Sequence, residues 1–469
     1  MKKTALCVLA TLSLVGCHHS SNNSSSGDAA TKPQLTAFHA ASDMPDATFL
    51  RVEEVWSSIG YGVAEAYRAV DPDTYSLHFD SRLPGDETTT CSGDINKNGT
   101  KDTNECTRLV TKSVNMINGH EYIAALVGKY GALDMTIYDD ATHVFSTTSN
   151  NGTGDTDAQV QFFNWSSQLG SFDVYLEPPG TNLSVTQVKA TLSAGQEFNG
   201  LVQQGTYVLT LTPVGDPNNP FYLSQTFALA PRTHVGFGVL DGTADSTSTI
   251  KVSRFRDQGG DLLDRRVQTF VRAAHVAPNT GNVDIYAQQN YTAPMFANLG
   301  LKQTTDYALV DPSSQNPLEL DITQANNVGV FLSRQQLFIT SSTRSTVFLV
   351  NTANGGLNGL LAIDSAHRIA PYAQLRLVNS VPQSLDYYVI PHDNNVFTST
   401  PSQVLASGTL GGSQLFDPGD YDLWILRTGT TAVAFGPQLL HMAGGGLYTI
   451  VGVPTADITR AEILQLGDF

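Results

Sequence analysis

Short apolar strands separated by turn residues run through the chain. Apolar and other positions alternate at a period of two in residues 172–176 (FDVYL), 283–287 (VDIYA) and 385–389 (LDYYV). This period is typical of a β-strand that buries one face. Helical periodicity is weak, and its best candidate, residues 63–70, is a single short stretch. The pattern therefore predicts an all-β protein.

The strands recur as four copies of one unit. Each copy opens with an apolar strand that ends in His or Asn and is followed by a turn, at His39, Asn164, His275 and Asn379. A strand with Asp and Tyr two residues apart follows in copies two to four, and residues 47–51 are its degenerate equivalent in copy one. A unit of roughly 100 residues with many short strands and turns indicates a β-sandwich.

Two further blocks complete each copy. One is a turn, mostly leading into a strand that carries a tyrosine, at residues 71–77, 203–209, 311–314 (without the tyrosine) and 417–423. Pro presets φ and Gly permits positive φ, so geometry explains the residues of these turns. The other block is a closing apolar strand, at residues 122–127, 235–240, 346–350 and 448–453.

The Tyr-Gly element at residues 59–62, with Tyr67, Val70, the turn into Tyr75 and the Asp-x-Tyr strands, resembles the bacterial domain-of-unknown-function 4397 (DUF4397) family. The resemblance covers most of the mature chain as four copies, although copy two lacks the Tyr-Gly element. It implies an extracytoplasmic protein and brings no catalytic residue. We therefore expect a tandem array of four immunoglobulin-like or transthyretin-like β-sandwich domains, at residues 34–148, 158–257, 265–366 and 372–469.

The first residues predict export and lipidation. Two lysines precede an apolar run of about ten residues, which is typical of a secretory signal peptide and too short to span a bilayer. Residues 14–17 (LVGC) resemble the lipobox of bacterial lipoproteins, so residues 1–17 are the expected signal with Cys17 as the lipidated residue. Residues 18–33 are rich in Ser, Asn and Gly and form a flexible tether.

The predicted location and the net charge of the protein limit the kinds of partner it can have. His18, rather than Asp, follows the lipobox cysteine, which by resemblance to Gram-negative lipoproteins implies the outer membrane, on either its periplasmic or its outer face. The formal net charge of −17 argues against a nucleic-acid partner and against basic patches on an anionic bilayer. The membrane contact is therefore expected through the lipid.

The cysteine-bracketed segment of copy one resembles a calcium loop. Cys91 and Cys106 remain after processing in an oxidising compartment, so we expect a disulfide. Between them, oxygen-bearing side chains match the EF-hand ligand register, with Gly99 at the turn position. The expected ligands are Asp94, Asn96, Asn98, Thr100, Asp102 and Glu105.

Two features separate this loop from an EF-hand pair. Lys101 occupies the position that is usually apolar, and no amphipathic helix flanks either end. An isolated, weak structural calcium site, similar to the loops of thrombospondin-type repeats and in the ~10⁻⁴ to 10⁻³ M range, is one interpretation. The alternative is a polar surface loop that the disulfide alone stabilises, by ~3 kcal/mol in the chain-entropy model.

The sequence contains no nucleophile elbow, zinc-protease motif or phosphate loop. His39 and His275 could form a two-domain site, but their equivalents are asparagines, so we expect them to bond backbone groups at strand ends. The Asp-x-Tyr pairs fit cross-strand packing, whereas a row of exposed tyrosines would suit carbohydrate contacts.

These observations favour a non-enzymatic, lipid-anchored cell-envelope protein that acts as a binding or spacer array. Its partner would be a glycan or an envelope protein, contacted by loops or by a concave face between domains. An envelope hydrolase with an unrecognised site between domains is the alternative. Assembly through exposed strand edges is a third interpretation.

Overall fold

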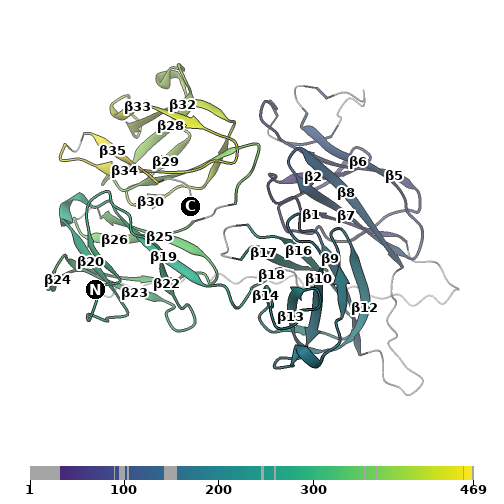
Figure 1. Ribbon diagram of the computed structural model, residues 1–469. Coiled ribbons are helices and arrows are strands. Elements are labelled where there is room, and N and C mark those ends of the chain that lie inside the picture. The colour runs from purple at the N-terminus through teal and green to yellow at the C-terminus, as the bar shows by residue number, and fades with distance from the viewer. Residues whose placement is uncertain are drawn as a thin grey trace, which may run out of the picture.

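The protein is an all-β tandem array of four β-sandwich domains, which confirms the predicted fold class (Figure 1). The computed structural model describes residues 32–88, 90–93, 101–102, 105–141, 156–243, 248–257, 260–352, 355–364, 367–457 and 459–466. Within these ranges the helices are three single turns of 3₁₀-helix, η1 Leu183–Val185, η2 Pro278–Thr280 and η3 Val396–Thr398. Residues 63–70, the best helical candidate, contain only β4.

The first and second sandwiches make up the N-terminal half. The first consists of β1 Gln34–His39, β2 Ala47–Arg51, β3 Glu54–Ile59, β4 Arg68–Ala69, β5 Thr74–Ser81, β6 Thr107–Asn115, β7 His120–Lys129 and β8 Ala132–Ala141. The second consists of β9 Asp157–Asn164, β10 Phe172–Glu177, β11 Ala190–Leu192, β12 Glu197–Gln203, β13 Gly205–Pro213, β14 Tyr222–Leu223, β15 Phe227–Leu229, β16 His234–Asp241, β17 Ile250–Phe255 and β18 Gly260–Leu262.

The third and fourth sandwiches follow. The third consists of β19 Thr269–His275, β20 Val283–Ala287, β21 Phe296–Leu299, β22 Ala308–Val310, β23 Leu318–Gln324, β24 Asn327–Leu337, β25 Arg344–Asn351 and β26 Leu357–Ile363. The fourth consists of β27 Ala373–Asn379, β28 Leu385–Pro391, β29 Gln403–Leu405, β30 Thr409–Leu410, β31 Gln414–Phe416, β32 Gly419–Arg427, β33 Val433–Met442, β34 Leu447–Pro454 and β35 Ala461–Leu466.

All four sandwiches have the same topology. In the first, one sheet has the order β4-β1-β7-β8 and the other the order β3-β2-β5-β6, and the other three sandwiches repeat this scheme. The opening strand always pairs in parallel with the closing apolar strand, as β1 does with β7 and β19 with β25. Each sandwich encloses its own hydrophobic core.

The tyrosine of the recurring turn fixes that turn in the three copies that have it. Its hydroxyl donates to the backbone carbonyl four residues earlier, from Tyr75 to Asp71 at 2.9 Å, from Tyr207 to Gln203 at 2.8 Å and from Tyr421 to Asp417 at 2.9 Å. This local bond is similar to the tyrosine corner of immunoglobulin domains. In the third sandwich, Asp311 instead accepts hydrogen bonds from the backbone and hydroxyl of Ser313.

The sandwiches pack in pairs through the outer faces of the sheets that hold the opening strands (Figure 1). We call the two contacts seams. The first seam joins the first and second sandwiches through Phe38, Ala40, Ile123, Ala125, Tyr138, Phe163, Trp165, Leu240 and Phe255. The second seam joins the third and fourth through Ala274, Val276, Phe348, Val350, Ala362, Val378, Val451, Val453 and Leu466. Opening strands are consequently buried on both faces.

The connection between the third and fourth sandwiches touches the first. The Ala370 amide donates to the Asp43 carbonyl at 2.7 Å, and the His367 ring lies 5.6 Å from the ring of Tyr61. These contacts link the two pairs. Within the part of the chain that the structure describes, no helix has the length and apolar character needed to cross a membrane.

Candidate functional site

The predicted lipidation and calcium residues fall mostly outside the described part of the chain. This applies to Cys17 and to Asp94, Asn96, Asn98 and Thr100. The disulfide between Cys91 and Cys106 is present, with the two Cα atoms 5.1 Å apart, as predicted.

Two of the proposed calcium ligands are described. Glu105 is buried, and its carboxylate accepts a hydrogen bond from the Asp102 amide at 3.0 Å. The neighbouring Lys101 ammonium pairs with buried Asp86, whose carboxylate also accepts from the Thr107 amide at 3.0 Å. Within the described ranges, no group of three or more His, Cys, Asp or Glu side chains is arranged to hold a metal. The calcium site therefore stays a prediction.

The repeated His and Asn side chains brace the turns that follow the opening strands. His39 Nδ1 accepts from the Ala41 amide at 3.3 Å, and Nε2 donates to the Pro45 carbonyl at 2.9 Å. Asn164 repeats this bridge by accepting from Ser166 and donating to the Gly170 carbonyl. His275 and Asn379 make corresponding bonds. Because these side chains are fully buried and bond local backbone, the predicted structural role is confirmed.

The Asp-x-Tyr pairs are also structural. Asp173 accepts from the Gly215 amide at 2.7 Å, Asp284 accepts from the Asn326 amide at 2.7 Å, and Asp386 accepts from the Gly429 amide at 3.2 Å. Each aspartate thus holds a distant hairpin turn. The paired tyrosines, Tyr175, Tyr286 and Tyr388, are buried, so they do not form an exposed row for carbohydrate contacts.

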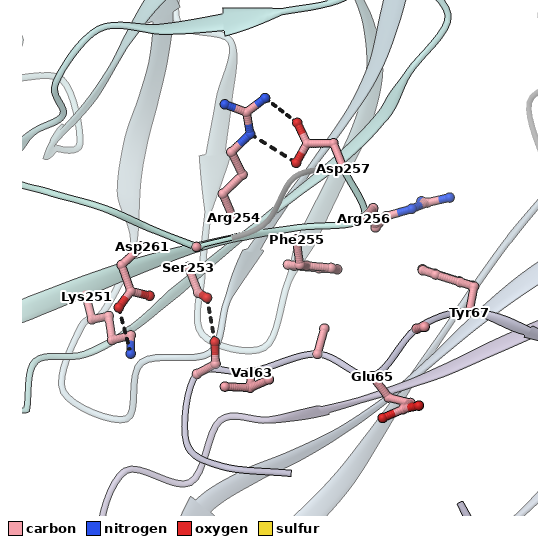
Figure 2. A pocket seen from close by; sticks show the side chains of 14 residues that line it. Val63, Glu65, Tyr67, Lys251, Ser253, Arg254, Phe255, Arg256, Asp257 and Asp261 are labelled. Carbon is pink, nitrogen blue, oxygen red and sulfur yellow. Dashed lines mark hydrogen bonds and ion pairs between the residues drawn. The ribbon is translucent and has the colours of Figure 1, made fainter. Parts of the chain in front are cut away.

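A cavity of about 540 Å³ opens where the first and second sandwiches meet (Figure 2). Residues 62–67 of the first sandwich form one wall, and β17, Arg256, Asp257 and the start of β18 form the other. Ser253 Oγ donates to the Gly62 carbonyl at 2.5 Å and ties the two walls together. Concave sites between domains are common places for ligands. We therefore take this cleft as the candidate binding site.

The charges that line the cleft are already paired. Lys251 Nζ lies 3.0 Å from an Asp261 carboxylate oxygen, and Arg254 makes a two-pronged pair with Asp257. Both pairs are visible in Figure 2. Paired ions leave the cleft without a strong excess of either sign. Such a surface suits a polar, uncharged ligand better than a strongly charged one.

Arg256 anchors the inner end of the cleft. Its guanidinium pairs with Glu121 of the first sandwich, and its side chain is only 5% exposed. The guanidinium carbon lies 4.7 Å from the centre of the Tyr67 ring. Burial raises the pKa of Tyr67, so its phenol stays protonated. Of the fourteen described residues that line the cleft, none is His or Cys. The cleft offers hydrogen-bonding groups and ion pairs.

A separate acidic cluster borders the first seam. Burial, and then the charges of Asp140 and Asp139, raise the pKa of Glu197 to about 7. Gln161 donates to Asp140 and accepts from Arg256, which connects this cluster to the cleft. The sequence did not reveal the cleft, because residues 62–67 and β17 meet only through the packing of two sandwiches. The basic and acidic run at residues 254–257 is the signal that could have drawn attention to it.

The fold and the cleft define a multidomain β-sandwich protein with a cleft between its first two domains. Residues 269–388 match the sequence model described as Domain of unknown function (DUF4397). This segment spans the third sandwich and the first strand of the fourth, and it ends within β28. The match supports the family resemblance for this part of the chain.

Two other comparisons complete the picture. A search of curated proteins found no match. Among solved structures, the chain aligns with "CBMbc (family CBM26) from Eubacterium rectale Amy13K in Complex with Maltoheptaose" at 14% identity, over 44% of this chain and 95% of that one, with a TM-score of 0.16. An alignment at this TM-score does not indicate a shared ligand.

Proposed function

We propose that the protein is a lipid-anchored, non-enzymatic binding or spacer protein of the bacterial outer membrane, and that all four sandwiches are copies of the DUF4397 unit. The observation that carries the proposal is the pairing of the sandwiches through two buried seams. Interfaces made of well-packed apolar side chains resist relative motion, so each pair is expected to act as one rigid body. A tether on a lipidated Cys17 would hold these bodies at a membrane.

The cleft between the first two sandwiches is the proposed binding surface. Its paired charges and backbone-bonded walls favour an uncharged polar polymer, such as an envelope glycan, over an ionic one. An envelope hydrolase would instead need an acid or nucleophile free to act in the cleft, whereas Asp257 and Asp261 are engaged with Arg254 and Lys251.

The test is capture of labelled cell-envelope fractions by the full mature chain. Asp261→Arg breaks a pair at the mouth of the cleft and places two cations together, so we expect capture to fall at least about fivefold. Asp216→Arg, in a half-buried turn of the same sandwich that does not line the cleft, is the matched control and should leave capture unchanged. Equal capture by both variants, or release of envelope sugar by the wild type that Asp261→Arg abolishes, would contradict the proposal.

Anchoring is tested separately. Cys17→Ser in the full-length chain should shift the protein from the membrane to the aqueous fraction and abolish incorporation of labelled fatty acid. A protein that stays in the membrane fraction after this change would refute the lipid anchor and leave the cleft proposal intact.

We also propose a structural calcium ion in the loop of the first sandwich. The pairing of Lys101 with Asp86 supports it, because this lysine is then held by a carboxylate outside the ligand set. Millimolar calcium should raise the melting temperature relative to chelator, and Asp94→Asn with Glu105→Gln should remove the difference. Identical wild-type melting curves in calcium and chelator would rule the ion out.

A further inference from the structure

The two seams differ at one equivalent position, which is a carboxylate with several partners in the first seam and borders a cavity in the second. A cavity of about 350 Å³ lies at the end of the second seam, between the third and fourth sandwiches. Its walls come from the turns after β19 and β27 and from the ends of β25 and β34. The corresponding turns and strand ends in the first seam follow β1 and β9, and end β7 and β16.

In the first seam this position is occupied by a satisfied carboxylate. Asp241, the last residue of β16, is buried and lies 3.0 Å from Lys129 Nζ. It also accepts hydrogen bonds from three hydroxyls, those of Ser42, Ser166 and Ser167. These side chains converge on Asp241, and both of its carboxylate oxygens have partners.

In the second seam the equivalent residue has lost those partners. Parallel pairing of β25 with β19 places Asn351 at the position of Asp241. By the same alignment, the residues that replace Lys129, Ser42, Ser166 and Ser167 are Thr455, Pro382, Ala277 and Pro278. Proline and alanine side chains have no hydrogen-bonding group. The two prolines line the cavity and cannot donate, and Ala277 lacks the hydroxyl by which Ser166 serves Asp241.

Asn351 is left with an unsatisfied amide. It is 3% exposed and lines the cavity, and among the residues that the structure describes neither its Nδ2 nor its Oδ1 has a hydrogen-bond partner. A buried polar group without a partner is costly, and such groups are rare in folded proteins. An amide presents a donor and an acceptor side by side. A complementary ligand has an acceptor and a donor side by side as well.

We propose that this cavity binds a small uncharged polar group that pairs with both ends of the Asn351 amide. The vicinal diol of a sugar and a carboxamide share this chemistry. Val381, Pro382 and Pro454 supply apolar walls for the carbon skeleton, and Thr455 supplies a hydroxyl. Arg460 at the rim lies 3.8 Å from Asp457, so its charge is partly compensated. The site is distinct from the cleft of the first pair.

The test uses ligand-observed NMR saturation transfer on the full mature chain, with D-glucose as the diol probe and acetamide as the carboxamide probe. At least one probe should receive saturation from the wild type, and the one that does identifies the source of the ligand group. Ala277→Ser restores a hydroxyl where Ser166 serves Asp241, so it should satisfy Asn351 internally and weaken probe binding about tenfold. Asn351→Ala should weaken binding to a similar degree.

Ala325→Ser, in the β23–β24 hairpin away from the cavity, is the matched control and should bind like the wild type. Thermal melting of all variants separates loss of the site from loss of the fold, because Ala277→Ser is expected to melt no lower than the wild type. Absence of saturation transfer to both probes would show that the cavity holds water alone and would overturn the proposal. Binding that survives both Ala277→Ser and Asn351→Ala would overturn it equally.

Discussion

The two seams use equivalent strands in the same register, yet their large side chains come from different positions in these strands. In the first seam the large side chain is Trp165, just after β9, and the facing position on β16 is Gly238. In the second seam the equivalent positions are Val276 after β19 and Phe348 on β25. A Cβ at Gly238 would lie 2.5 Å from Cζ3 of Trp165, so the glycine makes room for the indole. The repeated topology fixes where sandwiches meet, and complementary volume fills the contact.

The buried charges differ in a related way. In the first seam Asp241 faces Lys129, whose side chain is 36% exposed and can reach water. At the second seam, Asp364 is fully buried and pairs with Arg376 at 2.8 Å, with Arg272 at 3.7 Å, and both arginines are mostly buried. Tyr307 also donates to Asp364, at 2.7 Å. The second seam therefore concentrates its electrostatics on one carboxylate.

Removing that carboxylate is expected to have the largest effect. Asp364→Ala leaves two guanidinium groups without their shared partner and should lower the free energy of unfolding by about 3–5 kcal/mol. Asp241→Ala should cost less, about 1–3 kcal/mol, because Lys129 can turn to solvent. Denaturant unfolding followed by fluorine NMR of 5-fluorotryptophan separates the halves, since Trp424 reports the second pair and Trp165 the first. Equal losses would show that exposure of the cation is irrelevant.

The aromatic core of the first seam should respond almost as strongly. Trp165 packs 4.3 Å from Phe38 and 4.7 Å from Phe163 between ring centres, and its indole donates to the Tyr138 hydroxyl at 2.9 Å. Trp165→Ala should cost about 3–5 kcal/mol, whereas Val276→Ala at the equivalent place should cost about 2 kcal/mol. Chemical denaturation of both variants measures the difference. A larger loss of stability for Val276→Ala would show that the side chain at this position matters more in the second seam than in the first.

Moving side-chain volume between positions 165 and 238 tests whether the two residues share one space. Gly238→Ala alone should destabilise the protein by about 1–3 kcal/mol, because the added methyl collides with the indole. Combined with Trp165→Val, the same change should cost less than the sum of the two single changes, since the collision is gone. A double-mutant cycle measures this coupling. Strict additivity would mean that the two positions do not share one space.

Local features of this architecture could be predicted from the sequence, whereas contacts between units could not. The His39 and Asn164 bridges span six residues, so residue type and turn position were enough to predict them. The seams depend on which outer faces meet, whereas the alternating pattern predicts only one buried face per strand. Phe38 and Phe163 are buried on the other face. Their position in nearly continuous apolar runs is the signal for strands covered on both sides.

The buried carboxyl group of Glu197 at the first seam should make stability depend on pH, with a smaller effect than the changes above. The folded-state pKa of Glu197 is raised to about 7, so its stabilising contribution is present below the unfolded-state pKa and is lost as the pH rises through about 7. Stability therefore declines between the unfolded-state pKa of about 4.3 and the folded-state pKa of about 7. Glu197→Gln should flatten the decline in melting temperature across this window and leave stability below it unchanged. Glu87→Gln, at an exposed glutamate of the first sandwich, serves as the control and should keep the wild-type pH profile. An unchanged pH profile in Glu197→Gln would contradict the assignment.

The buried histidines should give the smallest effect, with the opposite sign. Burial lowers the pKa of His39 and of His275, because the charged ring loses its contact with water, and the carbonyl that each ring donates to opposes this shift only in part. Their contribution to stability is present above the unfolded-state pKa of about 6.5 and is lost as the pH falls toward the lower folded-state pKa. His39→Asn and His275→Asn copy the side chain that the second and fourth sandwiches use at this position. Each should keep the fold, change stability little at pH 8 and reduce the loss below pH 6, as measured by melting temperature across pH. If asparagine disrupts the fold at either site, the four positions are not interchangeable, and the histidines have a role beyond bracing the turn.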